Sequence, residues 1–492
     1  MVALNQANLA ALSSRIAVPA YDRSRVTPGI MHFGVGNFHR AHQAYYLDQV
    51  MAHGKSLDFG IIGVGLMPRD EQMRDVLAAQ DYLYTLVDKA PSGEWHARVV
   101  GSEIGFLYAP DDPRAVIEQL ADPAIRIVSL TITEGGYNFD QVTGDFIVDN
   151  PAIQAELVPG ALPTTVFGFL YEGLALRQER SVPPFTVMCC DNIQENGDVV
   201  RKALLAYANL RDHEFALWIG ASVHFPSSMV DRITPQTTDQ DRADIAERYG
   251  VDDGWPVVSE SFIQWVLTDD FPLGRPEYEL VGVQPVHDVV PYELMKLRLL
   301  NCSHQAIAYF AILAGYTYVH EAMGDPDIRR FVRAFMDVDA TPSIPPVPGE
   351  DLDVYKDTLI ARFSNPEVRD TVMRLGTEGS DRIPKWLIPM AKERLTVNGD
   401  IRRSAAMTAA WAKYCEGVDD AGHPLDIIDN AKASITAAAA KQAGDPLAFL
   451  RQEQFFGSLV EDARFTQPYL WTLDLLNAVG SRGTLKALVE LP

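Results

Sequence analysis

Residues 29–54 read GIMHFGVGNFHRAHQAYYLDQVMAHG, and this stretch decides the fold of the first half of the chain. Residues 29–33 form an apolar run typical of a buried strand, and Gly34 then begins a turn. Residues 39–54 have helical spacing and end on Gly54, a residue suited to a helix C-cap. The segment is therefore predicted to form a strand, a glycine-containing turn and a helix in immediate succession.

The alternation of strand and helix continues beyond this segment. Residues 58–65 are predicted to form a second strand. The runs at 126–133 and 185–190 are nearly continuous in apolar and β-branched residues, as is typical of strands buried on both faces of a parallel sheet. Strands and helices that alternate in this way predict an α/β fold with a Rossmann-like, doubly wound sheet.

The turn after the first strand has part of the spacing of a dinucleotide-binding fingerprint. Its first glycine permits a tight turn, and its second lets a pyrophosphate approach the backbone at the start of the next helix. Histidine replaces the usual third glycine, so the match is incomplete. A similar turn at residues 63–65 also follows a strand, but the first turn closes the first strand and is preferred. The cofactor-binding candidates here are Gly34, Gly36, Asn37, Phe38, His39 and Arg40.

Two acidic residues follow later predicted strands. Asp70 comes after the second strand, where an acidic residue usually meets the adenosine ribose, and it favours NAD over NADP. Arg69 beside it favours the opposite choice, so use of NADP stays open. Alternatively, Asp70 caps the helix that begins there. Glu134 ends the third strand and is either a carboxylate lining the cofactor site or a solvated turn residue.

The second half of the chain has a different character. From Pro291 onward helical patterns dominate, including alanine-rich helices at 404–415 and 430–444, and the proline-rich residues 341–353 are predicted to form a loop. We therefore predict a Rossmann-like NAD-binding domain over residues 1–286. A mostly α-helical substrate-binding and catalytic domain is predicted over residues 287–492, with the active site in the cleft between the two.

The segment PYELMKLRLLNCSH carries a lysine, an asparagine and a histidine on one helix. At about 100° per residue, Lys296, Asn301 and His304 lie at about 0°, 140° and 80°. A lysine among the neighbouring leucines would have its pKa lowered in a closed site, and could then take a proton near neutral pH. Asparagine amides stabilise a developing alkoxide, and Asn192 could converge with Asn301. Alternatively, Lys296 is a surface residue and His304 a core residue.

Two further groups are candidates for holding a polar ligand. Val230 and Asp231 follow a predicted strand, and Asp231 could lie near the domain boundary. Residues 374–385 concentrate Arg374, Arg382 and a lysine among turn residues, and such cations can hold hydroxyls or a carboxylate. The alternative for this second group is a solvated basic loop.

Composition excludes several classes of function. The chain has 42 basic and 66 acidic residues, and its net charge of −24 disfavours binding to nucleic acid or an anionic membrane. Four cysteines without a Cys-x-x-Cys pair, and dispersed histidines, indicate no disulfide scaffold and no metal site. The longest nearly apolar run, residues 306–319, is shorter than the ~20 residues of a membrane span. With no convincing signal peptide, the sequence predicts a soluble, cytoplasmic protein.

Five segments resemble the mannitol dehydrogenase family of polyol-specific long-chain dehydrogenases/reductases. They are IMHFGVGNFHRAHQAYYLD, SLTITEGGY, FTVMCCDNIQENG, MVDRITP and KLRLLNCSH. The resemblance extends over essentially the whole chain, and its Lys-x4-Asn-x2-His helix motif is highly specific. It implies an NAD-dependent, metal-independent hydride transfer that oxidises D-mannitol to D-fructose, and the reverse, in a monomer.

The same resemblance implies roles for individual residues. Lys296 would be the general base, Asn192 and Asn301 the oxyanion hole, and His304 would orient the substrate hydroxyls. Glu293 would gate proton exchange with solvent. The remaining matches to substrate-contacting positions are Asp231, Arg374 and Arg382, the last of which is commonly lysine in the family.

The family also includes enzymes with other substrates. D-Arabinitol 4-dehydrogenases, sorbitol dehydrogenases and fructuronate reductases share the glycine turn and the lysine helix, so these motifs do not separate the substrates. An acid substrate would need an additional cation at its far end. A different class of protein also stays open, namely an NAD-binding regulatory protein that has kept the fold without catalysis.

Overall fold

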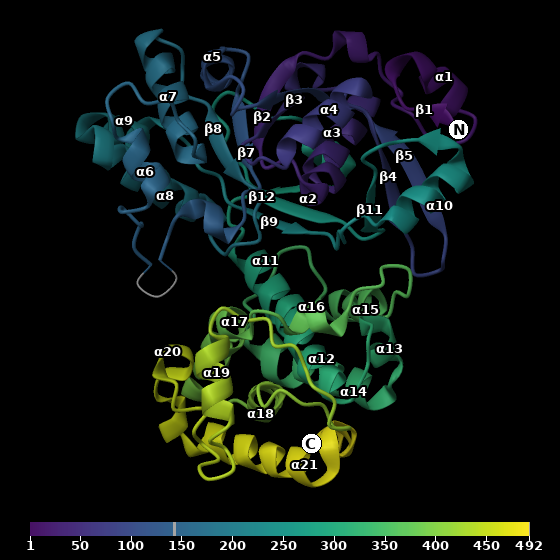
Figure 1. The fold of residues 1–492 in the computed structure, drawn as a ribbon, viewed down its shortest axis with the longest axis vertical. Helices are drawn as coiled ribbons and strands as arrows, with labels where there is room; N and C mark the ends of the chain where they lie inside the picture. Colours follow the sequence, from purple (N-terminus) through teal and green to yellow (C-terminus); the bar gives the residue numbers. More distant parts are fainter. Residues whose placement is uncertain (141–143, 492) are drawn as a thin grey trace. The chain divides into compact units, whose positions relative to one another are not determined.

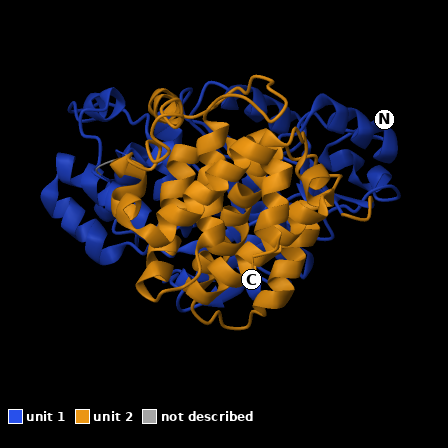
Figure 2. Ribbon diagram, turned by 90° about the horizontal axis from the view of Figure 1, so that it is seen from below, with its two compact units in different colours: residues 1–90, 94–290 blue, residues 91–93, 291–492 orange. Residues whose placement is uncertain are grey.

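The computed structural model describes residues 1–140 and 144–491. The chain forms two compact units (Figure 2). Unit 1 comprises Met1–Ala90 and Glu94–Val290, and unit 2 comprises Pro91–Gly93 and Pro291–Pro492. The division predicted from the sequence lies between residues 286 and 287.

Unit 1 is built on a parallel sheet of five strands in the order β6-β3-β2-β7-β8. Four of them, β2, β3, β7 and β8, are labelled in Figure 1. The five strands are β2 (Pro28–Phe33), β3 (Gly60–Gly65), β6 (Glu103–Tyr108), β7 (Ile127–Leu130) and β8 (Thr186–Cys189). The chain proceeds from β2 outward through β3 to β6, and then returns to the other side of β2 for β7 and β8. The order therefore reverses between β2 and β7, and open α/β sheets bind ligands at such a switch point, beyond the carboxyl ends of the strands.

Helices cover both faces of this sheet. Because strand side chains alternate between faces, Met31 and Phe33 pack with α5 (Pro113–Ala121), α7 (Val166–Glu179) and α8 (Asn196–Arg211). Ile30 points to the other face and packs with α3 (Gln43–Ala52). This arrangement confirms the predicted doubly wound α/β class, including the strands expected at the four apolar runs.

Smaller sheets complete unit 1 and were absent from the predicted organisation. One has the order β11-β4-β5 and another β13-β12-β9, and both mix parallel with antiparallel pairs. Their strands are β4 (Tyr84–Lys89), β5 (Trp95–Val100), β9 (Ser228–Asp231), β11 (Val257–Glu260), β12 (Gln264–Thr268) and β13 (Gln284–Val286), and β1 (Val2–Ala3) pairs with β10 (Val251–Asp252). The other α-helices of this unit are α1 (Leu9–Leu12), α2 (Asn37–Ala41), α4 (Asp70–Ala79), α6 (Pro151–Glu156), α9 (His213–Ser222) and α10 (Asp239–Tyr249).

The second half of the chain is helical, as predicted. Its centre is α12 (Cys302–Leu313), which is buried along almost its whole length and contacts α18 (Arg402–Tyr414) and α21 (Ala463–Val489). The remaining helices are α11 (Val290–Met295), α13 (Val319–Gly324), α14 (Pro326–Ala334), α15 (Leu352–Phe363), α16 (Val372–Gly376), α17 (Gly379–Thr396), α19 (Lys432–Ala439) and α20 (Glu453–Phe456). Among the described residues, no helix is both long and apolar enough to cross a membrane.

Candidate active site

The glycine turn lies at the switch point of the sheet, at the carboxyl end of β2. Gly34 has a φ of +90°, and a Cβ there would lie 2.1 Å from the carbonyl oxygen of Thr131, which follows the neighbouring strand β7. Gly36 is different, because its φ of −121° suits any residue and an added Cβ would meet only the Gly34 oxygen, at 3.8 Å. The protein therefore requires glycine at position 34 for its own packing, whereas position 36 faces open space.

This difference between Gly34 and Gly36 is consistent with a dinucleotide bound at the turn. No neighbour among residues 1–140 and 144–491 requires a glycine at position 36, but a pyrophosphate approaching the backbone at the start of α2 would need that space clear. Gly36, Asn37, Phe38 and His39 are the residues that would hold it through their backbone N–H groups, since the first i→i−4 bond of α2 is that of the Arg40 N–H to the Gly36 carbonyl.

The helix after the turn differs from the predicted one. Instead of a continuous helix over residues 39–54, α2 ends at Ala41 and α3 begins at Gln43, because His42 takes φ −123° and ψ −88°. The buried guanidinium of Arg40 donates to the Trp255 carbonyl at 2.6 Å and to Asn37 Oδ1 at 2.9 Å. These hydrogen bonds from the buried side chain of Arg40 stabilise the turn.

The side chain of His39 also lies inside the protein. Its ring stacks on His32 of β2 with the ring centroids 3.4 Å apart, and its Nε2 lies 3.1 Å from Glu103 of β6. Burial, with a contribution from Arg40, lowers the pKa of His39 to about 3, so its ring is neutral. Burial raises the pKa of Glu103 to about 7. A cofactor could contact position 39 only through its backbone.

Asp70 closes the turn between β3 and α4. Its Oδ2 accepts the N–H groups of Leu66, at 3.0 Å, and Met67, at 2.9 Å. This position at the carboxyl end of the second strand is the one expected of a ribose-binding residue. Both N–H groups precede α4, of which Asp70 is the first residue, so the alternative that Asp70 caps this helix is wrong. Recognition of a ribose by Asp70 stays a prediction.

Asp191, which was not among the predicted site residues, joins the ends of β7 and β8. Its carboxylate accepts the N–H groups of Ile132 and Thr133, each at 2.9 Å, and the hydroxyl of Tyr137 at 2.6 Å. These bonds hold the turn that carries the exposed Glu134, whose predecessor Thr133 has a φ of +61°. Asp191 directly follows the predicted strand at residues 185–190 and directly precedes Asn192. This position at the end of a strand is the sequence signal that could have identified Asp191.

The other predicted residues of unit 1 lie on or beside neighbouring strands. Asn192 is exposed just beyond β8. Val230 and Asp231 are buried at the end of β9, where Asp231 pairs in register with Gln264 of β12. Arg232 follows, with its guanidinium bonded to Asp88 and to the carbonyls of Ala41 and Glu260. The carboxyl ends of β7 and β8 thus carry Glu134 and Asn192 beside the glycine turn of β2.

In unit 2, Lys296 and Asn301 are the first and last residues of a π-helical turn, η6 (Lys296–Asn301). A π-helix bonds the N–H of residue i+5 to the carbonyl of residue i, so Asn301 lies just over one turn above Lys296. The angle of about 140° expected from α-helical spacing is therefore wrong, because the wider turn brings Asn301 round to the side of Lys296. Both residues are buried, with relative exposures of 7% and 5%.

The π turn is anchored by Arg298, which was not among the predicted site residues. The Arg298 guanidinium donates to the Ser343 carbonyl and, at 2.5 Å, to the Glu393 carboxylate of α17. One turn before Lys296, Glu293 is buried in α11. The helix motif Lys-x4-Asn thus consists of two buried polar side chains on one side of an unusual helical turn, and π turns occur often at functional sites.

His304 lies further along the same helix, half-buried, with its ring 5.0 Å from that of Phe363. Burial lowers its pKa to about 3, and the nearby guanidinium groups of Arg374, Arg362 and Arg382 act in the same direction. Its ring is therefore neutral and has both a donor and an acceptor for hydroxyl groups.

The structure brings two of the predicted arginines to this histidine. Arg374 makes a two-pronged ion pair with Asp370, and Arg382 donates to the carbonyls of Arg374 and Leu375 at 3.2 and 3.1 Å. Lys385, in contrast, pairs with Asp381 on its own helix, α17. Arg374 and Arg382 are therefore held in place by these bonds beside the neutral ring of His304.

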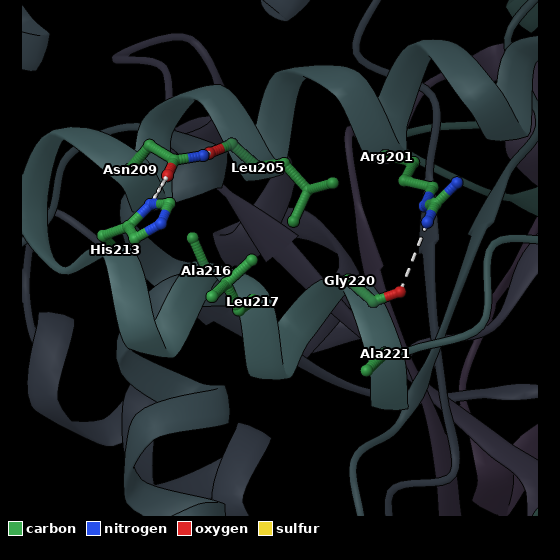
Figure 3. Close-up of a pocket in the computed structure, with 8 residues that line it drawn as sticks. All are labelled: Arg201, Leu205, Asn209, His213, Ala216, Leu217, Gly220 and Ala221. Atoms are coloured by element: carbon green, nitrogen blue, oxygen red, sulfur yellow. Dashed lines mark hydrogen bonds between the residues drawn. The ribbon is translucent and has the colours of Figure 1, made fainter.

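An open hollow of about 350 Å³ lies elsewhere in unit 1, between α8 and α9 (Figure 3). Its walls are mainly Leu205, Leu217 and alanines, with Arg201 and His213 at its ends. None of the predicted site residues lines it. Over residues 1–140 and 144–491, no group of three or more His, Cys, Asp or Glu side chains is arranged to hold a metal ion.

The fold and the site define a class of oxidoreductase with a Rossmann domain followed by a helical domain. The family model described as the mannitol dehydrogenase Rossmann domain matches residues 28–280, and that of the mannitol dehydrogenase C-terminal domain matches residues 288–474. The chain therefore belongs to the mannitol dehydrogenase family. The resemblance found in its sequence motifs is confirmed.

Individual relatives match over the full length. The chain is 44% identical to the mannitol 2-dehydrogenase of Aspergillus fumigatus and to mannitol dehydrogenase 2 of Saccharomyces cerevisiae, covering 99% of this chain and 98% and 97% of the relatives. A solved ternary complex of the Pseudomonas fluorescens mannitol 2-dehydrogenase with NAD and D-mannitol is 44% identical, with complete coverage of both chains and a TM-score of 0.90. A D-sorbitol dehydrogenase structure is 37% identical, with 98% and 100% coverage and a TM-score of 0.91.

Proposed function

We propose that this NAD-dependent oxidoreductase is a mannitol 2-dehydrogenase, which interconverts D-mannitol and D-fructose without a metal ion. The observation that carries the proposal is the pair of buried polar residues, Lys296 and Asn301, on one π turn of a chain whose full-length relatives include mannitol 2-dehydrogenases. That a relative was solved with NAD and D-mannitol supports this substrate and cofactor.

The proposed chemistry assigns one proton and one hydride to separate groups. NAD, when bound, accepts the hydride from the carbinol carbon. Lys296 Nζ takes the proton of the hydroxyl as the general base, and returns it in the direction of ketose reduction. The amide N–H groups of Asn301 and Asn192 donate to the substrate oxygen as negative charge develops on it. Glu293, one turn from Lys296, passes the proton to or from solvent.

The remaining candidates are proposed to bind the substrate chain. Neutral His304 offers a donor and an acceptor to the sugar hydroxyls, with Arg374 and Arg382 beside it. Asp231 accepts from a further hydroxyl. Asn192 and Asp231 belong to unit 1, and Lys296 belongs to unit 2. The monomeric state and the cytoplasmic location stay predictions from the sequence.

Sorbitol is the second candidate substrate, because the D-sorbitol dehydrogenase structure matches with a TM-score as high as that of the mannitol enzyme. Sequence identity favours mannitol, at 44% against 37%. Initial rates with mannitol, sorbitol, arabinitol and mannonate, each with NAD and with NADP, decide between these alternatives. Mannitol with NAD is expected to give the highest kcat/KM, and a higher value with another polyol would refute the substrate assignment.

The role of Lys296 is tested by its replacement. The Lys296→Met variant should lose several orders of magnitude in kcat while its NADH affinity stays within about twofold of the parent. Lys356→Met is a matched control, since Lys356 is also buried in unit 2 but pairs with Asp337 and Asp353. The control should lose stability and keep its turnover. A Lys296→Met enzyme with ordinary kcat would rule out the lysine as the base.

A further inference from the structure

The carbonyl of Gly34 in the glycine turn is held by a chain of hydrogen-bonded side chains that starts at Ser129. His32 of β2 and Ser129 of β7 face one another in register, and His32 Nδ1 lies 2.8 Å from Ser129 Oγ. His32 Nε2 lies 2.9 Å from Thr131 Oγ1, and the Thr131 hydroxyl donates to the Gly34 carbonyl at 2.7 Å. Ser129 and His32 have no exposed surface.

The direction of each hydrogen bond follows from the Gly34 carbonyl, which is the last acceptor of the chain. A carbonyl oxygen only accepts, so the single proton of the Thr131 hydroxyl is used on Gly34. Thr131 Oγ1 must then accept from His32, which places the ring proton on Nε2. The Nδ1 atom is consequently an acceptor and takes the hydroxyl proton of Ser129. Burial lowers the pKa of His32 well below its ordinary value, which agrees with a neutral ring carrying one proton.

The chain fixes one peptide group of the turn. In a trans peptide the carbonyl and the following N–H point in opposite directions. Because Thr131 holds the Gly34 carbonyl on the β7 side, the N–H of Val35 is turned to the opposite side, and the next residues lead directly to the open position at Gly36. Thr131 thus constrains Gly34 twice, because its backbone leaves no room for a Cβ at position 34 and its hydroxyl holds the Gly34 carbonyl.

We propose that Ser129, His32 and Thr131 are positioning residues for the cofactor: they orient the Gly34–Val35 peptide and with it the N–H groups from Gly36 to His39 that would bind the pyrophosphate. This inference rests on the assignment of NAD as the cofactor. The three residues do not touch the dinucleotide; they act through the backbone of the turn. His39, which replaces the fingerprint's third glycine, supports the same arrangement. Its ring stacks on the ring of His32 and fixes the plane of the His32 ring.

The experiment compares Thr131→Val, which keeps the shape but removes the hydroxyl, with Thr131→Ser, which keeps the hydroxyl. NADH dissociation constants are measured by fluorescence titration, and the KM for NAD and kcat are measured with saturating polyol. Thr131→Val should bind NADH about tenfold more weakly and raise the KM for NAD, with kcat at saturating NAD within about twofold. Thr131→Ser should restore NADH affinity to within about twofold. Ser129→Ala should weaken binding in the same direction by a smaller factor.

Thr484 of α21 provides a matched control, because its buried hydroxyl also donates to a glycine carbonyl, that of Gly480, at 2.7 Å. Thr484→Val should lower the melting temperature without changing NADH affinity. The inference fails if folded Thr131→Val binds NADH like the parent, if Thr131→Ser is as weak as Thr131→Val, or if the Thr484 control loses NADH affinity equally. Absence of NADH binding by the parent itself would instead overturn the cofactor assignment.

Discussion

Gly34 and Gly36 lie two residues apart, yet alanine should affect them in different ways. At Gly36, with φ −121°, the new methyl group meets only the Gly34 oxygen at 3.8 Å, so the fold should tolerate it to within about 1 kcal/mol. That methyl group projects where the pyrophosphate is expected to approach. Losing one hydrogen bond to a charged phosphate costs about 1.5–3 kcal/mol, which corresponds to roughly 10- to 100-fold weaker NADH binding.

At Gly34 the same change should damage the protein itself. The methyl group would lie 2.1 Å from the Thr131 carbonyl oxygen and 2.8 Å from its carbon, and both are backbone atoms that cannot turn aside. The φ of +90° adds strain for any residue with a Cβ, and together these effects should destabilise unit 1 by at least about 2 kcal/mol.

Thermal unfolding and NADH fluorescence titration of the same samples separate the two cases. Gly36→Ala should melt like the parent and bind NADH weakly, whereas Gly34→Ala should melt several degrees lower. A Gly36→Ala variant that binds NADH as tightly as the parent would show that the open position is not where the cofactor lies. A Gly36→Ala variant that fails to fold would contradict the steric argument for that residue.

Three further predictions concern the metal, the pH profile and the stability. Dialysis against a chelator should leave activity unchanged, and a loss that zinc restores would contradict the metal-free reaction. Because the pKa of His304 is lowered to about 3, its ring stays neutral from pH 5 to 9, so His304→Gln should lower kcat/KM without removing a limb of its pH profile. The pKa of Glu103 is raised by burial to about 7, so the stabilising effect of its neutral form is complete below about pH 4.5 and is lost as pH rises through 7. Glu103→Gln should abolish this loss, of up to about 3 kcal/mol, in chemical unfolding measured between pH 4.5 and 8.

The strands of the main sheet could be predicted because their signal is local. A continuous apolar run bounded by glycine indicates a strand buried on both faces, whichever neighbours it has. The mixed sheets β11-β4-β5 and β13-β12-β9 could not be predicted in the same way. The first pairs strands from distant parts of the chain, such as Val257 with Leu86, and the short strands of both sheets carry no sequence pattern that identifies the partner.

The helix that carries Lys296 and Asn301 shows where sequence periodicity misleads. Every residue of KLRLLN is acceptable in an α-helix, so local propensity gives no reason to expect a wider turn. The π turn is maintained by tertiary contacts, among them the bonds from Arg298 to Ser343 and Glu393, which lie 45 and 95 residues further along the chain. The sequence therefore identified Lys296 and Asn301 as a pair but predicted the wrong angle between them.

His39 shows how a departure from a motif can be part of the site. The third glycine of the fingerprint normally allows the first helix to pack closely on the strand. Here that helix is only the short α2, which ends at Ala41, and the space beside β2 is filled by the His39 ring stacked on His32. His32 in turn is bonded to the residue that anchors the Gly34 carbonyl. The histidine that makes the sequence match incomplete therefore supports the same glycine turn by stacking, where other dinucleotide-binding proteins rely on close packing of helix and strand.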